Sequence, residues 1–520
     1  MYDTKIVIRR SAIIVENYTL GSCPKLEKSF SIFDKVYHKY YMKGAYYDAD
    51  THRLYLPRGV NIGWLEHLLE CPSYMYEQFD PIDQIPPVLI KYLPRDKVQS
   101  TALDFILGNG DYLANRFKPQ LSVNLNTGKG KTYVAIAASS FLLYRTIMIT
   151  SNLDWINQWK DCILEYTDTK PEEIYIIAGA SSITKLKNGM HDISKIKYIL
   201  ASHATIQSYA NKHGWPAVGE LFKFFKVGFK IYDEAHLYFD NICMIDFFTN
   251  TYKNIYLTAT PARSDRNENN IYQKSLRSMP KIDLFNEVDD PHTQYISIQY
   301  NSHPSVYDMN NCATGYGFSM IKYASYIINR PNFYKILYVI IDMCMNMDGK
   351  ILIYIGRNES IAIVYNWMLY NFPFLNGCVG IYNSTIPKEY KEAQLNNKFI
   401  LTTTKSCGAA MDIKGLKATI LLAEPFGSEV LARQTLGRTR DANTYYIEIV
   451  DTGFNAIRNY YFKKLKIFNK YATQCSNILL NDLTLNEKYN EVYWKHNTRS
   501  LDYLNEMKKG LPKGFHHVKK

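Results

Sequence analysis

The chain has 520 residues, a length that suggests about three domains rather than one compact core. Hydrophobic residues make up 47% and charged residues 21%, a globular composition that excludes a largely disordered chain. Lysine plus arginine (61) exceeds aspartate plus glutamate (49), and the net charge of +12 is mild for this length, so it permits a polyanionic partner without requiring one.

The cysteines and the N-terminus indicate a cytoplasmic protein without a membrane partner. The 9 cysteines are scattered singly and never stand at zinc-knuckle spacing, so a structural zinc site is not expected. Scattered thiols are typical of a reducing compartment. The first residues, MYDTKIVIRRSAIIVENY, lack the continuous apolar core of a signal peptide, and no uncharged apolar run is long enough for a membrane span.

Residues 1–90 are predicted to form a small β-rich N-terminal domain. The segments KIVIRR and SAIIVENY are predicted strands, and AYYDADTHRLYLPRG is a predicted hairpin that turns at residues 48–50. An amphipathic segment, NIGWLEHLLE, follows the hairpin. The pair Pro86-Pro87 then breaks the chain before a different pattern begins.

The rest of the chain is predicted to be α/β, with two consecutive parallel-sheet units. Residues 91–270 alternate apolar runs such as TIMIT, KYILA, FKIYD and NIYLT with helical segments, which is typical of βαβ units. Residues 271–330 lose this alternation and are predicted to be a linker or an insertion. Residues 331–452 resume it. Residues 453–520 are predicted to be a basic helical tail that frays at its end.

The sharpest chemical signal is LNTGKGKT at residues 125–132, between an apolar stretch and a helical segment. A glycine-bearing loop in this place can wrap backbone N–H groups around phosphates at a helix N-terminus. Lys131 would reach the β and γ phosphates, and the Thr132 hydroxyl would ligate Mg²⁺. Because Leu125 stands where the strict pattern has glycine, an ordinary Gly-Lys turn stays open here. The remaining loop residues assigned to the nucleotide are Thr127, Gly128 and Gly130.

A second signal, Asp233-Glu234-Ala235-His236, directly follows the apolar run FKIY. A carboxylate at the C-terminal end of a parallel strand lies where such sheets bind ligands. We expect Asp233 to hold Mg²⁺ through water, and Glu234 to orient or deprotonate the attacking water. The alternative is a solvated turn of two acids, and the preceding phosphate-loop candidate makes that alternative weak.

Together these motifs resemble those of a superfamily 2 helicase of the Asp-Glu-Ala-His type. The resemblance covers residues 95–452, and the motifs occur in the family's order. It implies two tandem RecA-like parallel-sheet domains that enclose one ATP, with phosphate and Mg²⁺ groups on the first domain and arginines on the second. Closure on ATP and reopening after hydrolysis would move bound nucleic acid.

In the first domain, the resemblance assigns three kinds of role. Gln99 matches the glutamine that reads adenine in this family. His236, Thr258 and Thr260 match the groups that couple the nucleotide site to the nucleic-acid track. Contacts to the nucleic-acid backbone are implied for four polar residues, which are Ser151, Asn152, Ser202 and Thr205.

In the second domain, the resemblance implies that Thr404 contacts the nucleic acid and Asp412 the nucleotide. The segment QTLGRTR resembles the motif that supplies glutamine and arginine to the γ-phosphate, namely Gln434, Arg438 and Arg440. Arg438 stands at the usual spacing from Gln434, so we expect it to be the arginine finger. Arg440 lies one position short of the common register and is expected to have a supporting role.

The predicted tail interleaves lysines with aromatic residues in FNAIRNYYFKKLKIFNKYA. Lys463 and Lys464 are candidates for gripping phosphates while the neighbouring rings stack on bases. A merely solvated helix face is the alternative.

The implied function is an ATP-dependent helicase or translocase that uses Mg²⁺ and couples hydrolysis to movement along nucleic acid and to strand separation or remodelling. DNA is favoured over RNA, contacts should be largely independent of sequence, and a monomer is expected. Two alternatives stay open: a double-strand DNA translocase that does not separate strands, and an ATP-gated nucleic-acid-binding scaffold.

The layout also resembles helicases of phages and large DNA viruses, both the branch-remodelling type and the poxvirus-type transcript-release enzymes. This resemblance implies partners in replication, recombination or transcription. For a viral protein it implies a location in the host cytoplasm or the virion.

Overall fold

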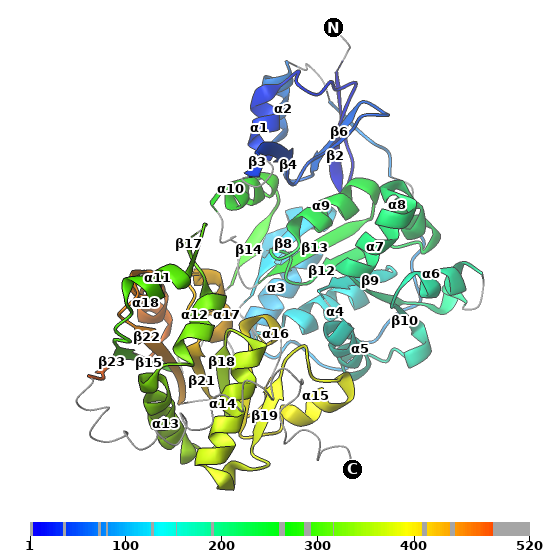
Figure 1. Cartoon of the computed structure of the whole chain (residues 1–520). Helices are drawn as coiled ribbons and strands as arrows, with labels where there is room; N and C mark the ends of the chain where they lie inside the picture. The colour runs from blue at the N-terminus through cyan, green and yellow to red at the C-terminus, as the bar shows by residue number, and fades with distance from the viewer. Residues whose placement is uncertain are drawn as a thin grey trace. The chain divides into compact units, whose positions relative to one another are not determined.

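The computed structural model forms two compact units, Met1–Glu287 and Val288–Lys520, and each contains a parallel sheet with helices (Figure 1). The structure describes residues 4–34, 38–70, 74–79, 82–125, 129–151, 153–188, 192–258, 266–284, 293–315, 317–407, 413–436 and 443–481. Within these ranges, no helix combines the length and the apolar character that crossing a bilayer requires. The expected α/β class is confirmed.

The first unit has a sheet of seven described strands in the order β10-β11-β9-β12-β13-β8-β14, and every pairing in it is parallel. The strands are β8 (Gln120–Asn124), β9 (Thr146–Thr150), β10 (Ile174–Ile177), β11 (Tyr198–Ser202), β12 (Phe229–Tyr232), β13 (Lys253–Thr258) and β14 (Lys281–Asp283). Five of them, namely β8, β9, β11, β12 and β13, are buried along their whole length, as expected for a sheet covered on both faces.

The described helices around this sheet are α3 (Lys97–Leu107), η1 (Gly110–Phe117), α4 (Lys131–Leu142), α5 (Leu153–Tyr166), η2 (Pro171–Glu173), α6 (Ala180–Lys187), η3 (Ile193–Lys195), α7 (His203–His213), α8 (Trp215–Phe224), α9 (Phe239–Phe248) and α10 (Arg266–Ser275). Their ends follow local chemistry. For example, α3 begins where Asp96 accepts a hydrogen bond from the Gln99 N–H, and it ends at Gly108 in the left-handed conformation.

The N-terminal part is a five-stranded sheet in the order β5-β6-β2-β1-β7, with a separate two-stranded hairpin, β3–β4. Its elements are β1 (Lys5–Ile8), β2 (Ala12–Glu16), α1 (Pro24–Ser29), β3 (Ser31–Asp34), β4 (Lys39–Met42), β5 (Tyr46–Asp48), β6 (Arg53–Pro57), α2 (Ile62–Leu69) and β7 (Tyr74–Tyr76). The hairpin predicted around residues 48–50 is confirmed, because β5 and β6 pair antiparallel with Asp48 opposite Arg53.

This N-terminal sheet does not have a core of its own. Its buried residues belong to one hydrophobic cluster with residues of the first parallel sheet and of α7, α8 and α9. Aromatic rings make the junction: Tyr55 stacks on Phe248 with ring centroids 5.2 Å apart, and Tyr46 meets the same ring edge-on at 5.7 Å. The N-terminal part is therefore held against α9 by burial of large rings.

The second unit has a sheet of seven strands among the described residues, in the order β19-β20-β18-β21-β22-β15-β23, and all of them are parallel. The strands are β15 (Thr293–Tyr300), β18 (Lys350–Ile355), β19 (Val379–Tyr382), β20 (Phe399–Thr402), β21 (Leu416–Ala423), β22 (Thr444–Asp451) and β23 (Gln474–Leu479), with β16 (Ala313–Thr314) and β17 (Gly317–Phe318) as a separate hairpin.

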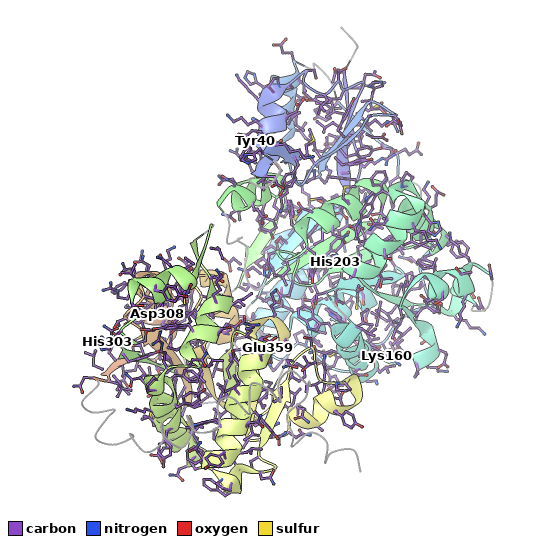
Figure 2. All side chains as sticks on the ribbon, in the orientation of Figure 1. Tyr40, Lys160, His203, His303, Asp308 and Glu359 are labelled. Atoms are coloured by element: carbon purple, nitrogen blue, oxygen red, sulfur yellow. The ribbon has the colours of Figure 1, made fainter. Side chains whose placement is uncertain are left out.

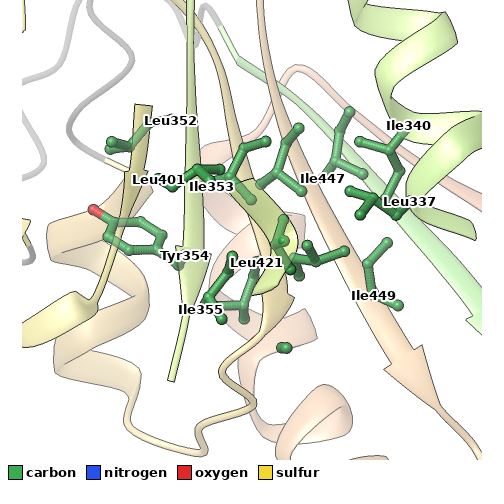
Figure 3. Packing of buried hydrophobic residues seen from close by; sticks show 14 of the residues in the cluster. Leu337, Ile340, Leu352, Ile353, Tyr354, Ile355, Leu401, Leu421, Ile447 and Ile449 are labelled. Carbon is green, nitrogen blue, oxygen red and sulfur yellow. The ribbon is translucent and has the colours of Figure 1, made fainter. Parts of the chain in front are cut away.

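The described helices of this unit are α11 (Val306–Asn311), α12 (Met320–Ile327), α13 (Pro331–Met345), α14 (Asn358–Asn371), η4 (Pro373–Leu375), α15 (Lys388–Gln394), α16 (Thr404–Cys407), α17 (Glu429–Leu436) and α18 (Asn455–Tyr471). Figure 3 shows part of the core that they build with the sheet, including Leu337 and Ile340 from α13 and Ile353 from β18.

The interval 271–330, predicted to be a linker or an insertion, contains strands of both parallel sheets. Strand β14 pairs with β8 in the first sheet, and β15 lies between β22 and β23 in the second. The strand signal was hidden because β14 has only 3 residues and β15 alternates buried and partly buried positions, unlike the continuous apolar runs elsewhere.

The predicted tail that begins at residue 453 is also different in the structure. Helix α18 packs against β22 and β23, and β23 pairs with β15 as a further strand of the sheet. Phe468 stacks on Tyr295 with ring centroids 4.0 Å apart. Residues 455–479 are therefore part of the second domain, and residues 482–520 lie outside the described part of the chain.

Lys464, expected to bind phosphates, is instead buried in an ion pair with Glu448. The other carboxylate oxygen of Glu448 accepts a hydrogen bond from the Tyr295 hydroxyl at 2.7 Å. Burial lowers the pKa of Lys464, while the Glu448 carboxylate acts in the opposite direction. The expectation of a nucleic-acid contact at Lys464 was wrong, because this side chain lies on the buried face of α18, which packs against the sheet. Its neighbour Lys463 is exposed.

Replacing Lys464 with alanine should destabilise the protein by about 3–5 kcal/mol, because Glu448 would keep a buried charge without a counter-ion. Lys463→Ala, on the exposed face of the same helix, is the matched control and should change stability by no more than about 0.5 kcal/mol. Urea unfolding followed by circular dichroism measures both. Equal stabilities of the two variants would contradict the buried ion pair.

Candidate functional site

The phosphate-loop candidate connects β8 to α4, and Gly130 fixes its geometry. Gly130 has a φ of +83°, and a Cβ at this position would overlap the Gln99 side-chain nitrogen. Only glycine satisfies both conditions, since other residues adopt this φ rarely and all carry a Cβ. Two further loop residues assigned to the nucleotide, Thr127 and Gly128, lie outside the described residues.

Gln99 is held against this loop from α3. Its side-chain oxygen accepts a hydrogen bond from the Arg95 N–H at 2.8 Å, and its side-chain nitrogen donates to the Lys129 carbonyl at 3.5 Å. The structure thus places Gln99 beside the loop, a contact that the order of the motifs in the sequence does not reveal. Its role in reading adenine stays a prediction.

Lys131 is the first residue of α4, and its side chain reaches back across the loop. The Nζ atom lies 3.4 Å from the Leu125 carbonyl oxygen and 3.6 Å from Glu234 Oε1. Thr132 follows in the same first turn, half-buried. The N–H groups of this turn have no partner within the helix, which makes it a place where anions bind.

Asp233 follows β12 directly and is buried. Its Oδ2 atom accepts a hydrogen bond from the Trp159 indole N–H at 3.0 Å. Burial, and next the neighbouring Glu234 carboxylate, raise the pKa of Asp233 to about 6, while Lys131 acts in the opposite direction. Two adjacent buried carboxylates facing one lysine fit a site for a divalent cation, since bound positive charge would offset their repulsion.

Glu234 has strained backbone and a carboxylate oxygen that accepts no hydrogen bond among the described residues. Its φ is 46°, in the left-handed region that non-glycine residues rarely occupy and that costs about 1–3 kcal/mol. Its Oε1 faces Lys131, whereas the buried Oε2 accepts no hydrogen bond among the described residues. A strained residue with an unsatisfied carboxylate oxygen is typical of a catalytic base.

His236 connects this carboxylate to the end of the neighbouring strand. Its Nδ1 lies 2.9 Å from the Thr258 hydroxyl oxygen and 3.4 Å from Glu234 Oε2. Thr258 is the last residue of β13, and Thr260, also predicted to couple the two sites, lies outside the described residues. The chain therefore has a physical link between Glu234 and the end of β13.

The nucleic-acid candidates of the first unit lie at the C-terminal ends of β9 and β11. Ser202 caps α7, with its hydroxyl accepting from the Thr205 N–H at 3.1 Å and lying 2.9 Å from the Thr205 hydroxyl. Ser151 follows β9, and Asn152 lies outside the described residues. The Ser202 and Thr205 hydroxyls thus already serve a helix cap, and their contact with a phosphate backbone stays a prediction.

In the second unit, Thr404 binds a carboxylate that sequence reasoning missed. The Thr404 N–H donates to Glu424 Oε2 at 2.9 Å, and its hydroxyl donates to Glu424 Oε1. Burial raises the pKa of Glu424 to about 7, and the two Thr404 hydrogen bonds oppose this shift. The sequence signal was present, because Glu424 directly follows the apolar run KATILLA, as Asp233 follows FKIY.

The remaining candidates of the second unit are the four residues of its two C-terminal motifs. Arg438, Arg440 and Asp412 lie outside the described residues. Gln434 belongs to α17, but its side chain is not described. Their assignment to the nucleotide rests on the sequence motifs alone.

Comparison with known proteins covers part of this site. The family model described as "Type III restriction enzyme, res subunit" matches residues 93–263, a range that includes the loop, Asp233, Glu234 and His236. A protein of Sulfurisphaera tokodaii named DNA 3'-5' translocase XPB2 is 29% identical over 189 residues, which are 35% of this chain and 35% of that protein. The chain thus aligns with about a third of the length of this relative.

Two solved structures share the fold. One is S. cerevisiae Dbp5 bound to RNA and ADP BeF3, with a TM-score of 0.50 at 13% identity, covering 77% of this chain and 93% of that one. The other is a fragment described as an HsdR subunit of a type I restriction enzyme from Vibrio vulnificus YJ016, with a TM-score of 0.50 at 14% identity, covering 90% and 85%. The expected tandem RecA-like architecture is confirmed.

Glu424→Gln should stabilise the protein above neutral pH. The carboxyl pKa is raised from 4.5 to about 7 on folding, so the fold favours its protonated form. The stability gained from that form is fully present below pH 4.5 and is lost as the pH rises through 7. The glutamine variant should therefore exceed the parent by about 2–3 kcal/mol at pH 8 and match it below pH 4.5.

Urea unfolding across this pH range measures the difference, with Glu429→Gln at an exposed position as the control. A constant difference between the Glu424 variant and its parent at all pH values would show that the Glu424 carboxyl does not titrate differently on folding.

Proposed function

We propose that this protein is an ATP-dependent nucleic-acid helicase or translocase of superfamily 2, with its Asp-Glu-Ala-His segment as the hydrolysis centre. One observation carries the proposal: Lys131, at the start of α4, lies 3.6 Å from Glu234, whose other carboxylate oxygen accepts no hydrogen bond in the described part of the chain. A lysine for phosphates and a base for water stand together, as phosphoryl transfer to water requires.

Each residue of the site has a defined task in this proposal. The first turn of α4 and Lys131 would bind the triphosphate, and Thr132 and Asp233 would hold Mg²⁺. When bound there, the cation would supply positive charge against the phosphate oxygens. Glu234 orients the attacking water and accepts its proton, and the link through His236 to Thr258 carries the state of the nucleotide site to β13.

The substrate is proposed to be DNA, gripped along its backbone with little regard for sequence. The name of the S. tokodaii relative, a DNA translocase, supports DNA, although the match covers only a third of that protein. Lys464 is buried and is no longer a candidate for binding nucleic acid. On the exposed face of α18, Lys463, Lys466 and Phe462 support a contact with the strand. We also propose a monomer in the cytoplasm that serves replication, recombination or transcription, with a viral or phage source.

Two other functions use the same residues. A double-strand DNA translocase would move without separating strands, and strand displacement measured beside ATP hydrolysis distinguishes it. A scaffold that clamps nucleic acid without turnover is the second. The buried, strained Glu234 with its unsatisfied oxygen argues against the scaffold, because a protein without turnover gains nothing from that cost.

Lys131→Ala should reduce nucleic-acid-stimulated ATP hydrolysis to background, since this lysine stabilises charge that develops in the transition state. Lys118→Ala, at an exposed position just before β8, is the control and should keep the parent rate. Hydrolysis should be measured with single-stranded DNA, duplex, forked DNA and an RNA–DNA hybrid. Turnover by Lys131→Ala within a few-fold of the parent would refute the assignment of this loop, and the preferred stimulator identifies the substrate class.

Glu234→Gln should separate binding from turnover. The amide keeps the shape of the side chain but cannot accept the proton of water, so hydrolysis should fall by about 10²–10⁴-fold. Nucleotide-dependent binding to labelled DNA, measured by fluorescence anisotropy, should persist. Parallel loss of ATP affinity and turnover would mean that Glu234 holds the cation or supports the fold instead.

A further inference from the structure

The hairpin formed by β3 and β4 exposes aromatic rings that have no role in the proposed ATP hydrolysis. It stands outside the five-stranded sheet, and Phe33 pairs in register with Tyr40. Their ring centroids are 5.1 Å apart, yet 43% of Phe33 and 65% of Tyr40 are exposed to solvent. The ring centroids of His38 and Phe33 lie 6.4 Å apart. Tyr40 of this hairpin is labelled in Figure 2. Grouped exposed rings mark a surface that binds a partner.

The surroundings of this hairpin are basic. In the described ranges 24–34 and 38–43, lysines stand at 25, 28, 39 and 43 and acids at 27 and 34, and the charge of Lys43 is paired with Glu268 of α10. Lys25 and Lys28 are exposed on α1, which packs against β3. The Glu27 carboxylate accepts hydrogen bonds from the Tyr18 hydroxyl at 2.8 Å and the Gly21 N–H at 2.6 Å, so it already has partners of its own.

Exposed rings on the hairpin, with exposed lysines on the helix that precedes it, fit one class of ligand better than others. A nucleobase offers a flat face for stacking on Phe33 and Tyr40, and the phosphates of the same strand offer negative charge to Lys25 and Lys28. An apolar protein partner would have no use for the lysines, and paired bases in a duplex would have no face to offer. The charge and the rings together select a single strand.

The hairpin is attached firmly to the motor domain. Lys43, directly after β4, forms an ion pair with Glu268 of α10 and lies 3.2 Å from Asp240 of α9. A Cβ added at the next residue, Gly44, would lie 2.8 Å from the Phe239 ring. Helix α9 follows the Asp-Glu-Ala-His segment, and α10 follows the segment after β13. A base stacked on the hairpin would therefore have a fixed position relative to both.

We propose that the rings of Phe33, His38 and Tyr40, with the lysines of α1, are a stacking site for unpaired bases of single-stranded nucleic acid. This site rests on the proposed function, because it adds a contact for the strand on which the motor acts. It lies in the N-terminal part, for which neither the motifs nor the family match provides a role.

The test uses the full chain and fluorescence anisotropy with three labelled probes: oligodeoxythymidine, oligouridine and a blunt DNA duplex. Phe33→Ala with Tyr40→Ala should weaken binding of single strands about tenfold or more, while duplex binding changes by less than about twofold. Tyr40→Phe should restore binding when Phe33 is present, because stacking needs the ring and not the hydroxyl. The two single-stranded probes separate DNA from RNA.

Tyr74→Ala with Tyr76→Ala is the matched control. These tyrosines are 44% and 62% exposed, nearly the same as the hairpin pair, and the Glu77 that follows them is paired with Arg9, so they match the hairpin pair in exposure without belonging to the hairpin. The control should bind all probes like the parent. Thermal unfolding checks that both double variants fold. Lys25→Glu with Lys28→Glu, at exposed positions, gives an independent reading and should also weaken single-strand binding and reduce its dependence on salt.

The outcomes separate this site from the proposed function. A parent protein that binds no probe overturns both. If the parent binds single strands and the hairpin and charge variants bind them equally well, the stacking site is overturned and the proposed helicase function stands. Equal losses for single strands and duplex, or equal losses in the hairpin variant and the matched control, also overturn it, because neither pattern comes from bases stacking on these two rings.

Discussion

The parallel order of β12, β13 and β8 is the constraint on which the site depends. Parallel neighbours end at the same edge of a sheet, so the loop after β8 and the acids after β12 come together there although they are far apart in sequence. Lys131 then lies 3.6 Å from Glu234, and His236 reaches Thr258 at the end of β13. In an antiparallel arrangement of these three strands, Thr258 at the end of β13 would lie at the opposite edge from the groups that follow β12 and β8.

Each unit also contains a buried lysine that pairs with a carboxylate, and that carboxylate also accepts hydrogen bonds from tyrosine hydroxyls. In the first unit, Lys230 pairs with Asp246, which also accepts a hydrogen bond from Tyr232. In the second unit, the pair is Lys464 with Glu448. Such pairs are tolerated in a core only when every polar atom has a partner, and the hydroxyls provide the additional donors. Several of the chain's 44 tyrosines have this task, which composition alone does not reveal.

The N-terminal part and α18 show that domain boundaries predicted from sequence can differ from the boundaries of the hydrophobic cores. The residue patterns of both segments differ from those of the parallel-sheet units, so the sequence predicts them as separate parts. In the structure, Tyr55 stacks on Phe248 of α9, and Phe468 of α18 stacks on Tyr295 of β15. Burial of large rings joins segments regardless of their distance along the chain. The hydrophobic pattern of neighbouring residues does not reveal such contacts.

The sequence by itself determined the elements and chemistry that depend on near neighbours. Apolar runs predicted the central strands, and the glycine-rich loop and the Asp-Glu-Ala-His segment identified Lys131 and Glu234. Tertiary structure alone decided which charged residues face solvent and which are buried. Lys463 and Lys464 are adjacent in one helix, yet one is exposed and the other pairs with Glu448, because a helix turns about 100° per residue and only one face meets the sheet. Which face meets the sheet is fixed by contacts with distant strands, and for that reason it was beyond the reach of the sequence pattern.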